Sequence, residues 1–111
     1  MERDEATLVD IARAARFVLE FKAGLDKAAF FDDFKTQSAV LHQLMIIGEA
    51  VKRLSDEFRS HHPRVPWGLI AGMRDKLIHG YDIVDLEEVW RTAEADVPDL
   101  LSQIEPLLPA Q

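Results

Sequence analysis

The 111-residue sequence contains no cysteine, and this absence excludes several kinds of chemistry. Disulfide frameworks, thiolate nucleophiles and cysteine-based zinc or iron–sulfur sites all need that side chain. No apolar run approaches the roughly 20 residues that cross a bilayer. The charged start at residues 1–5 is unlike a signal peptide. We therefore expect a cytoplasmic protein with no membrane partner.

Glycine and proline are also few, five of each, whereas hydrophobic residues make up 48% of the chain and charged residues 30%. This composition is that of a globular protein and not of a disordered one. The length fits one domain, and no internal repeat or linker divides it. We expect a single domain over residues 1–111.

The net charge of −7 argues at first against a nucleic-acid partner, but it is unevenly distributed. Residues 82–111 carry eight acidic side chains and one basic one, which accounts for the whole −7. Residues 1–81 carry twelve of each sign. Within them, residues 52–81 hold six bases against three acids, so the centre of the chain is locally basic.

Apolar residues recur with helical spacing nearly everywhere, which predicts an all-α fold. We expect an up-down bundle of four main helices plus one short helical turn. The predicted ranges are about 4–23, a turn at 26–31, 33–58, 67–79, and a helix that starts at 85. Gly24 should end the first helix, and Asp32 or Asp33 should cap the second. Asp85 should cap the last helix, and Pro98 should kink it.

The third predicted helix carries the unusual residues. Leu69, Ile70, Met73 and Leu77 share one face, which predicts a core position for them. Another face lines up two glycines with Asp75 and His79, and the glycines would let a helix or a phosphate approach closely. Asp75 lies one turn before His79, where a carboxylate can orient an imidazole. Arg74 lies five residues before His79, so a straight helix would keep the two apart.

The string Arg74-Asp75-Lys76-Leu77-Ile78-His79-Gly80-Tyr81 resembles the R-x-x-x-x-H-x-Y motif of the HepT-like proteins, a branch of the HEPN superfamily. Two further stretches resemble family segments on the second helix and before the motif, and a third resembles the start of the last helix. These three stretches are residues 46–55, 66–75 and 84–90.

The resemblance implies a helical homodimer with its paired motifs in an interface cleft. It implies a metal-independent endoribonuclease that acts as the toxin of a type VII-like HepT–MntA toxin–antitoxin pair. Arg74 and His79 would be the catalytic pair, with Asp75 supporting His79. The partner would be an MntA-like nucleotidyltransferase antitoxin, which neutralises the toxin by AMPylation of Tyr81.

These residue types suit RNA cleavage without a metal ion or cofactor. The 2′-hydroxyl of RNA can attack the adjacent phosphorus if a base takes its proton and an acid protonates the leaving 5′-oxygen. Histidine titrates near neutral pH, and arginine binds phosphate with a permanent planar charge. One chain supplies one motif histidine, and a dimer supplies two that could divide the base and acid roles.

Each assignment has a simpler alternative. Arg74 and His79 could form a structural ion pair or helix cap, and Tyr81 could be a buried aromatic whose hydroxyl is bonded. Lys52, Arg53 and Lys76 could contact RNA, as could Arg59 and Arg64, or they could belong to a solvated charged surface. The alternative function is a non-catalytic HEPN subunit that binds a nucleotide or docks a nucleotidyltransferase.

Overall fold

In the computed structural model, which describes residues 2–81 and 83–110, nearly all regular structure is helical. The elements in chain order are α1 (Glu2–Lys22), α2 (Lys27–Phe31), α3 (Phe34–Lys52), α4 (Asp56–His61), α5 (Trp67–Ala71), α6 (Met73–Leu77), α7 (Leu86–Arg91), the π-helix η1 (Thr92–Asp96), α8 (Val97–Ile104) and the 3₁₀ turn η2 (Glu105–Leu107). The predicted all-α class is confirmed, although several of the expected helices are divided.

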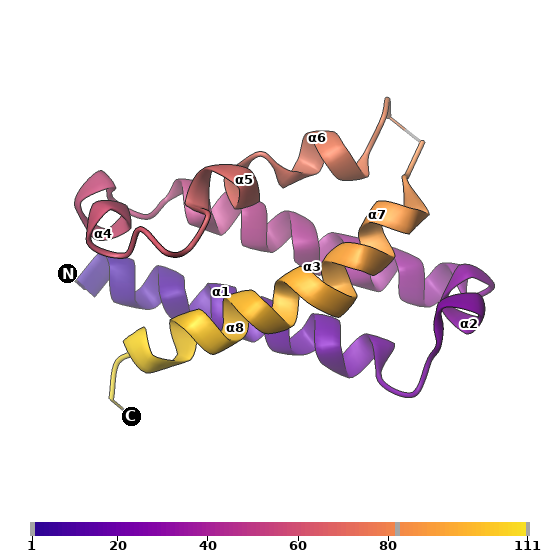
Figure 1. The fold of residues 1–111 in the computed structure, drawn as a ribbon, viewed down its shortest axis with the longest axis horizontal. Coiled ribbons are helices and arrows are strands. Elements are labelled where there is room, and N and C mark those ends of the chain that lie inside the picture. Colours follow the sequence, from indigo (N-terminus) through magenta and orange to yellow (C-terminus); the bar gives the residue numbers. More distant parts are fainter. Residues whose placement is uncertain (1, 82, 111) are drawn as a thin grey trace.

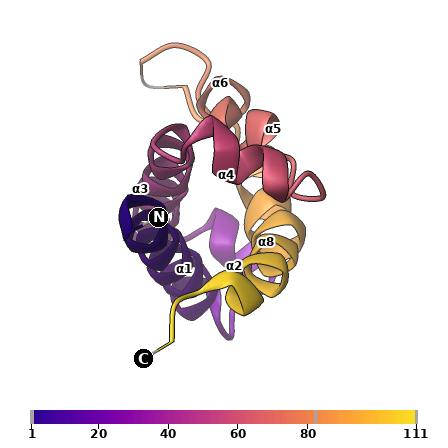
Figure 2. The same cartoon turned by 90° about the vertical axis from the view of Figure 1, so that its left-hand side faces the viewer.

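The helices run back and forth along the long axis of the molecule (Figure 1). Helices α1 and α3 lie side by side in opposite directions and make the most extensive contact in the fold. Helix α8 packs on α1, and α5 packs on α3 (Figure 2). None of the described helices combines the length and apolar character that a membrane span requires.

The core lies between these layers and takes the predicted apolar stripes. Its most deeply buried large side chains are Leu8, Ile11, Val18, Phe30, Val40, Leu44, Ile47, Val51, Leu77, Val89 and Ile104. The stripe of the last helix is buried as expected, at Val89, Trp90, Ala93, Val97, Leu100, Leu101 and Ile104. Burial of this apolar surface is the main force that holds the helices together.

Gly24, Asp33 and Asp85 stop or cap helices as the sequence predicts, and Asp26 is a further cap. Gly24 has φ of +80° and follows the end of α1, in the left-handed region that glycine adopts most easily. Asp26 and Asp33 cap α2 and α3, because their carboxylates accept the N–H of Ala29 and Thr36. Hydrogen bonds from Thr36 lower the pKa of Asp33. Asp85 caps α7 in the same way.

The prediction that the second helix extends to residue 58 is wrong, since α3 ends at Lys52 and α4 begins at Asp56. Between them Ser55 is extended and caps α4. The buried carboxylate of Asp4 accepts hydrogen bonds from the N–H of Ser55 (2.9 Å) and from its Oγ (2.7 Å). The backbone bond and then the side-chain bond lower the pKa of Asp4. A contact with a residue 51 positions away therefore accompanies the break between α3 and α4.

The last helix shows a second difference. The π-helix η1 joins α7 to α8, where a kink at Pro98 was expected. Pro98 stands in the first turn of α8, a position where its missing N–H costs least. The wider π turn keeps the apolar stripe buried on both sides of the proline.

Candidate active site

The motif segment is not one helix, which corrects the prediction of a helix over residues 67–79. Helix α5 ends before Gly72, α6 ends at Leu77, and Ile78 is extended. Ile78 forms an antiparallel bridge with Val84, and the N–H of Asp85 bonds to the carbonyl of Leu77 (2.8 Å). Pairing with a later segment has ended the helix before His79.

The expected face of two glycines with Asp75 and His79 therefore does not exist, because the helix that would align them is broken. Leu69, expected in the core, is 66% exposed, whereas Met73 and Leu77 are buried as predicted. A Cβ at Gly72 would meet only the carbonyl oxygen of Gly68, at 3.5 Å, within the described chain.

His79 begins a tight turn that projects from the helical body. Its N–H donates to the carbonyl of Ile83 (2.7 Å), and Gly80 has φ of +96°, which a side chain would strain. Tyr81 follows on this turn and is 99% exposed. The alternative of a buried, hydrogen-bonded tyrosine is wrong.

The ring of His79 has a defined neighbour in the carbonyl oxygen of Lys76, 3.2 Å from Nε2. In the tautomer that carries its proton on Nε2, this contact is a hydrogen bond to the carbonyl, and Nδ1 is left to accept a proton from a substrate. Asp75 was expected to orient this ring, but the hydrogen bond recorded for the ring is to the Lys76 carbonyl.

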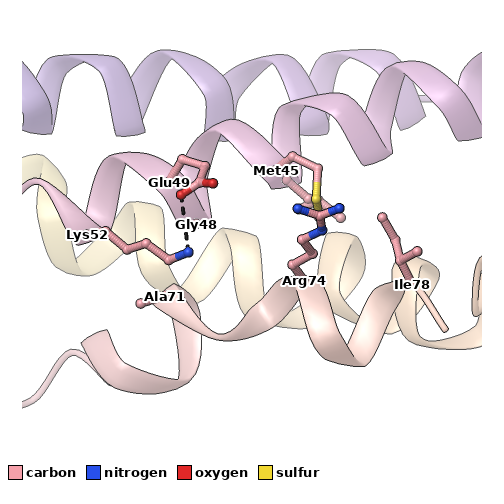
Figure 3. A pocket seen from close by; sticks show the side chains of 8 residues that line it. Met45, Gly48, Glu49, Lys52, Ala71, Arg74 and Ile78 are labelled. Carbon is pink, nitrogen blue, oxygen red and sulfur yellow. Dashed lines mark ion pairs between the residues drawn. The ribbon is translucent and has the colours of Figure 1, made fainter. Parts of the chain in front are cut away.

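Arg74 projects from α6 toward α3 and lines a cavity of about 220 Å³. In Figure 3 the Met45 side chain lies above the Arg74 guanidinium, with Ile78 to the right of Arg74 and Ala71 to its left. None of the ion pairs recorded for residues 2–81 and 83–110 involves Arg74. Its guanidinium is therefore placed to receive an anion.

A larger, more open cavity of about 680 Å³ adjoins the first. Lys52, Ala71, Arg74 and Ile78 line both, and Asp75 and Gly80 line only the outer one. Lys52 forms an ion pair with Glu49, with 3.2 Å between the charged atoms (Figure 3). Because this pair is exposed to solvent, breaking it costs little free energy.

The structure brings only part of the predicted set together. Lys52, Arg74 and Asp75 share the outer cavity, and the turn of His79 and Tyr81 begins beside it at Gly80. Arg53 lines a groove between α1 and α3, and Lys76 lines a cavity that α8 also borders. No group of three or more histidine, aspartate or glutamate side chains in the described parts of the chain could hold a metal ion.

Sequence reasoning did not assign the walls of the inner cavity to a site. Gly48 is buried, and a Cβ there would lie 3.3 Å from the carbonyl oxygen of Ile70. This close approach of α3 to α5 fixes the distance between Met45 and Ala71 across the cavity. The signal was present, since Gly48 interrupts an apolar helix, where glycine costs about 1 kcal/mol.

Comparison with known proteins agrees with the motif. Residues 11–107 match the family described as Ribonuclease HepT-like. A "Probable ribonuclease HepT" of Thermococcus cleftensis is 44% identical over 90% of this chain and 91% of its own length. A protein of Caldanaerobacter subterraneus, with a proposed RNase activity in its name, is 40% identical over 97% of this chain and 96% of its own.

A longer relative from Methanocaldococcus jannaschii carries both gamma-glutamylcyclotransferase and a proposed RNase in its name. It is 36% identical over 85% of this chain, which corresponds to 42% of that protein. No solved structure matches. The family match spans most of the sequence, and this chain belongs to the Ribonuclease HepT-like family.

Proposed function

We propose that this protein is an endoribonuclease that cuts RNA without a metal ion, with Arg74 and His79 as its catalytic residues. The observation that carries the proposal is the Arg74 guanidinium, which lines two adjoining cavities next to the turn that bears His79. Relatives of similar length with ribonuclease in their names support the activity.

The reaction follows from the groups present. His79 Nδ1 takes the proton of the RNA 2′-hydroxyl, and the 2′-oxygen attacks the adjacent phosphorus. Arg74 stabilises the charge that develops on the phosphoryl oxygens. The bond to the 5′-oxygen breaks, an acid protonates that oxygen, and a 2′,3′-cyclic phosphate remains. In a homodimer the second His79 supplies the acid.

RNA cleavage in the presence of EDTA tests this mechanism. The wild type should cut, and Arg74→Ala and His79→Ala should each lose about 10²–10⁴-fold in rate. Both side chains are exposed, so thermal unfolding of these variants should match that of the wild type. Equal cleavage by the wild type and His79→Ala would refute the assignment.

We further propose that the enzyme is the toxin of a toxin–antitoxin pair and that a nucleotidyltransferase inactivates it through Tyr81. The Tyr81 hydroxyl would attack the α-phosphorus of ATP, lose its proton and release pyrophosphate. The 99% exposure of Tyr81 supports this step, because a transferase must reach the hydroxyl. The mass of protein co-expressed with a nucleotidyltransferase from a neighbouring gene should increase by one or more AMP units, and Tyr81→Phe should prevent the increase.

The competing function is a non-catalytic subunit that binds a nucleotide or docks the transferase. The inner cavity favours this alternative, because an apolar space beside two cations also suits a nucleotide that is bound but not cut. A wild type that causes no growth arrest, cuts no RNA and still binds ATP would favour this alternative.

A further inference from the structure

The two cavities at Arg74 differ in size in a way that matches the two parts of a nucleotide. Pockets for drug-sized ligands measure about 300–1,000 Å³. The inner cavity, at about 220 Å³, is below this range and holds one flat ring system at most. The outer cavity, at about 680 Å³, has room for a sugar and its phosphate.

The chemistry of the walls follows the same division. Five of the eight residues that line the inner cavity have no charged or polar side-chain group, and these are Leu44, Met45, Gly48, Ala71 and Ile78. The charged side chains of Lys52 and Arg74 line both cavities, so cations stand where the two spaces join. Each cavity also has one carboxylate in its wall, Glu49 in the inner one and Asp75 in the outer one, and Glu49 is paired with Lys52. A mostly apolar space that opens onto two cations suits a ligand with a flat ring at one end and an anion at the other.

We propose that the inner cavity binds one base of the RNA, while Lys52 and Arg74 hold the adjoining phosphate in the outer cavity. The identification of the ligand as RNA rests on the proposed function. Met45 and Ala71 are the specificity-determining walls, and Arg74 sets the distance from base to phosphate. Glu49 releases Lys52 when the phosphate arrives, because their exposed ion pair is weak.

An adenylate attached to the Tyr81 hydroxyl would be a second source of a base and a phosphate. Tyr81 directly follows Gly80, which lines the outer cavity. The shared chemistry is a nucleoside monophosphate, and the experiments separate the free RNA nucleotide from the attached adenylate.

The first experiment measures binding by titration calorimetry, with the four nucleoside monophosphates and with ribose 5-phosphate, which has no base. We expect at least one nucleoside monophosphate to bind about tenfold more tightly than ribose 5-phosphate, a gain typical of modest apolar contact with one ring. Ala71→Leu fills the inner cavity and should abolish that difference. Equal affinity of ribose 5-phosphate and all four nucleotides for the wild type would overturn the proposal.

Two further variants keep this test interpretable. Ala95→Leu adds the same side chain to an exposed alanine of η1, outside both cavities, and should bind like the wild type. Met45→Ala removes a wall without filling the space and should weaken nucleotide binding about threefold or more. If Ala71→Leu unfolds below the assay temperature, Met45→Ala provides the test. A nucleotide affinity of Met45→Ala equal to that of the wild type would refute the base site.

The second experiment separates this inference from the proposed function. Cleavage positions on a mixed RNA pool should show a base preference that Met45→Ala weakens. Base-dependent binding without cleavage would leave the base site standing and refute the ribonuclease. Cleavage whose base preference is unchanged in Met45→Ala would support the ribonuclease and refute the base site.

A third measurement compares the affinity of free nucleoside monophosphates for adenylated and unmodified wild type. The adenylated protein should lose this binding, and an unchanged affinity would assign the site to RNA alone.

Discussion

The pair of helices α1 and α3 and the segment over residues 67–84 are built in opposite ways. Helices α1 and α3 are 21 and 19 residues long, and their inward stripes are almost completely buried. In the second segment α5 and α6 have five residues each, and Arg74, His79 and Tyr81 are exposed. Long helices bury apolar area efficiently, whereas short ones leave backbone groups and cavities open.

Stability and chemistry are therefore located largely in different parts of this protein. The helix pair is held by burial, which depends on total apolar area. The segment over residues 67–84 also buries Trp67, Met73 and Leu77, but its exposed end is held by single hydrogen bonds, such as Asp85 N–H to Leu77 O and His79 N–H to Ile83 O. Substitutions of buried side chains should therefore affect stability, and substitutions of the exposed Arg74, His79 and Tyr81 should affect function.

The largest expected change in stability is that of Ile11→Ala. Ile11 is completely buried in α1, and removal of a buried side chain of this size costs about 2–5 kcal/mol of unfolding free energy. Leu69→Ala, in the 66% exposed position of α5, should change it by less than about 0.5 kcal/mol. Urea denaturation measures the unfolding free energy of both variants. Equal losses in the two would contradict the difference in stability between the two regions.

Asp4→Ala should come next, with a loss of about 1–3 kcal/mol, because two donors of Ser55 lose their acceptor. The pKa of Asp4 is lowered in the folded protein, so its contribution is complete above the unfolded value of about 4. That contribution disappears as the pH falls through the folded pKa. The stability difference between wild type and Asp4→Ala should thus shrink below about pH 4. Asp10→Ala, at an exposed position of the same helix, is the control and should show little loss.

Gly48→Ala examines the point where the two regions meet. The added Cβ would lie 3.3 Å from the carbonyl oxygen of Ile70, so α5 must shift away from α3. Overpacking outweighs the gain in helix propensity, and we expect a net loss of about 1–2 kcal/mol. Thermal unfolding measures this, and a more stable variant would show that the approach is looser than described.

Gly72→Ala should have a smaller effect than Gly48→Ala, and of the opposite sign. Gly72 has φ of −92°, and a Cβ there would be in ordinary contact with Gly68. Alanine is compatible with this backbone and should stabilise the protein by about 0.4–1 kcal/mol through the unfolded state. A clear loss of stability in urea would mean that the break between α5 and α6 needs glycine itself.

The sequence predicted those parts of the fold that depend on neighbouring residues. The caps at Asp33 and Asp85 and the stop at Gly24 were all confirmed, because each acts within a few residues of its helix end. The helix over residues 67–79 was wrong, because its end depends on pairing between Ile78 and Val84. The break after Lys52 also escaped prediction, since the apolar periodicity continues through it to Phe58 and the contact between Asp4 and Ser55 joins distant parts of the chain.

The candidate site divides in the same way. The spacing of Arg74, His79 and Tyr81 was visible in the sequence and carried the family resemblance, and the family match supports that resemblance. The turn that exposes Tyr81 and the carbonyl beside the His79 ring were not visible, because they follow from the early end of α6. The catalytic assignment itself stays a prediction.

The helical class, the buried stripes and the motif follow from the amino-acid sequence, because periodicity and spacing are local properties of the chain. Which cations meet depends on how distant segments pack. The tertiary structure placed Lys52 with Arg74 across the joined cavities and directed Arg53 and Lys76 elsewhere. The reason is physical, since the close approach of α3 to α5 at Gly48 and the breaks at Gly72 and Ile78 arise from packing between distant segments.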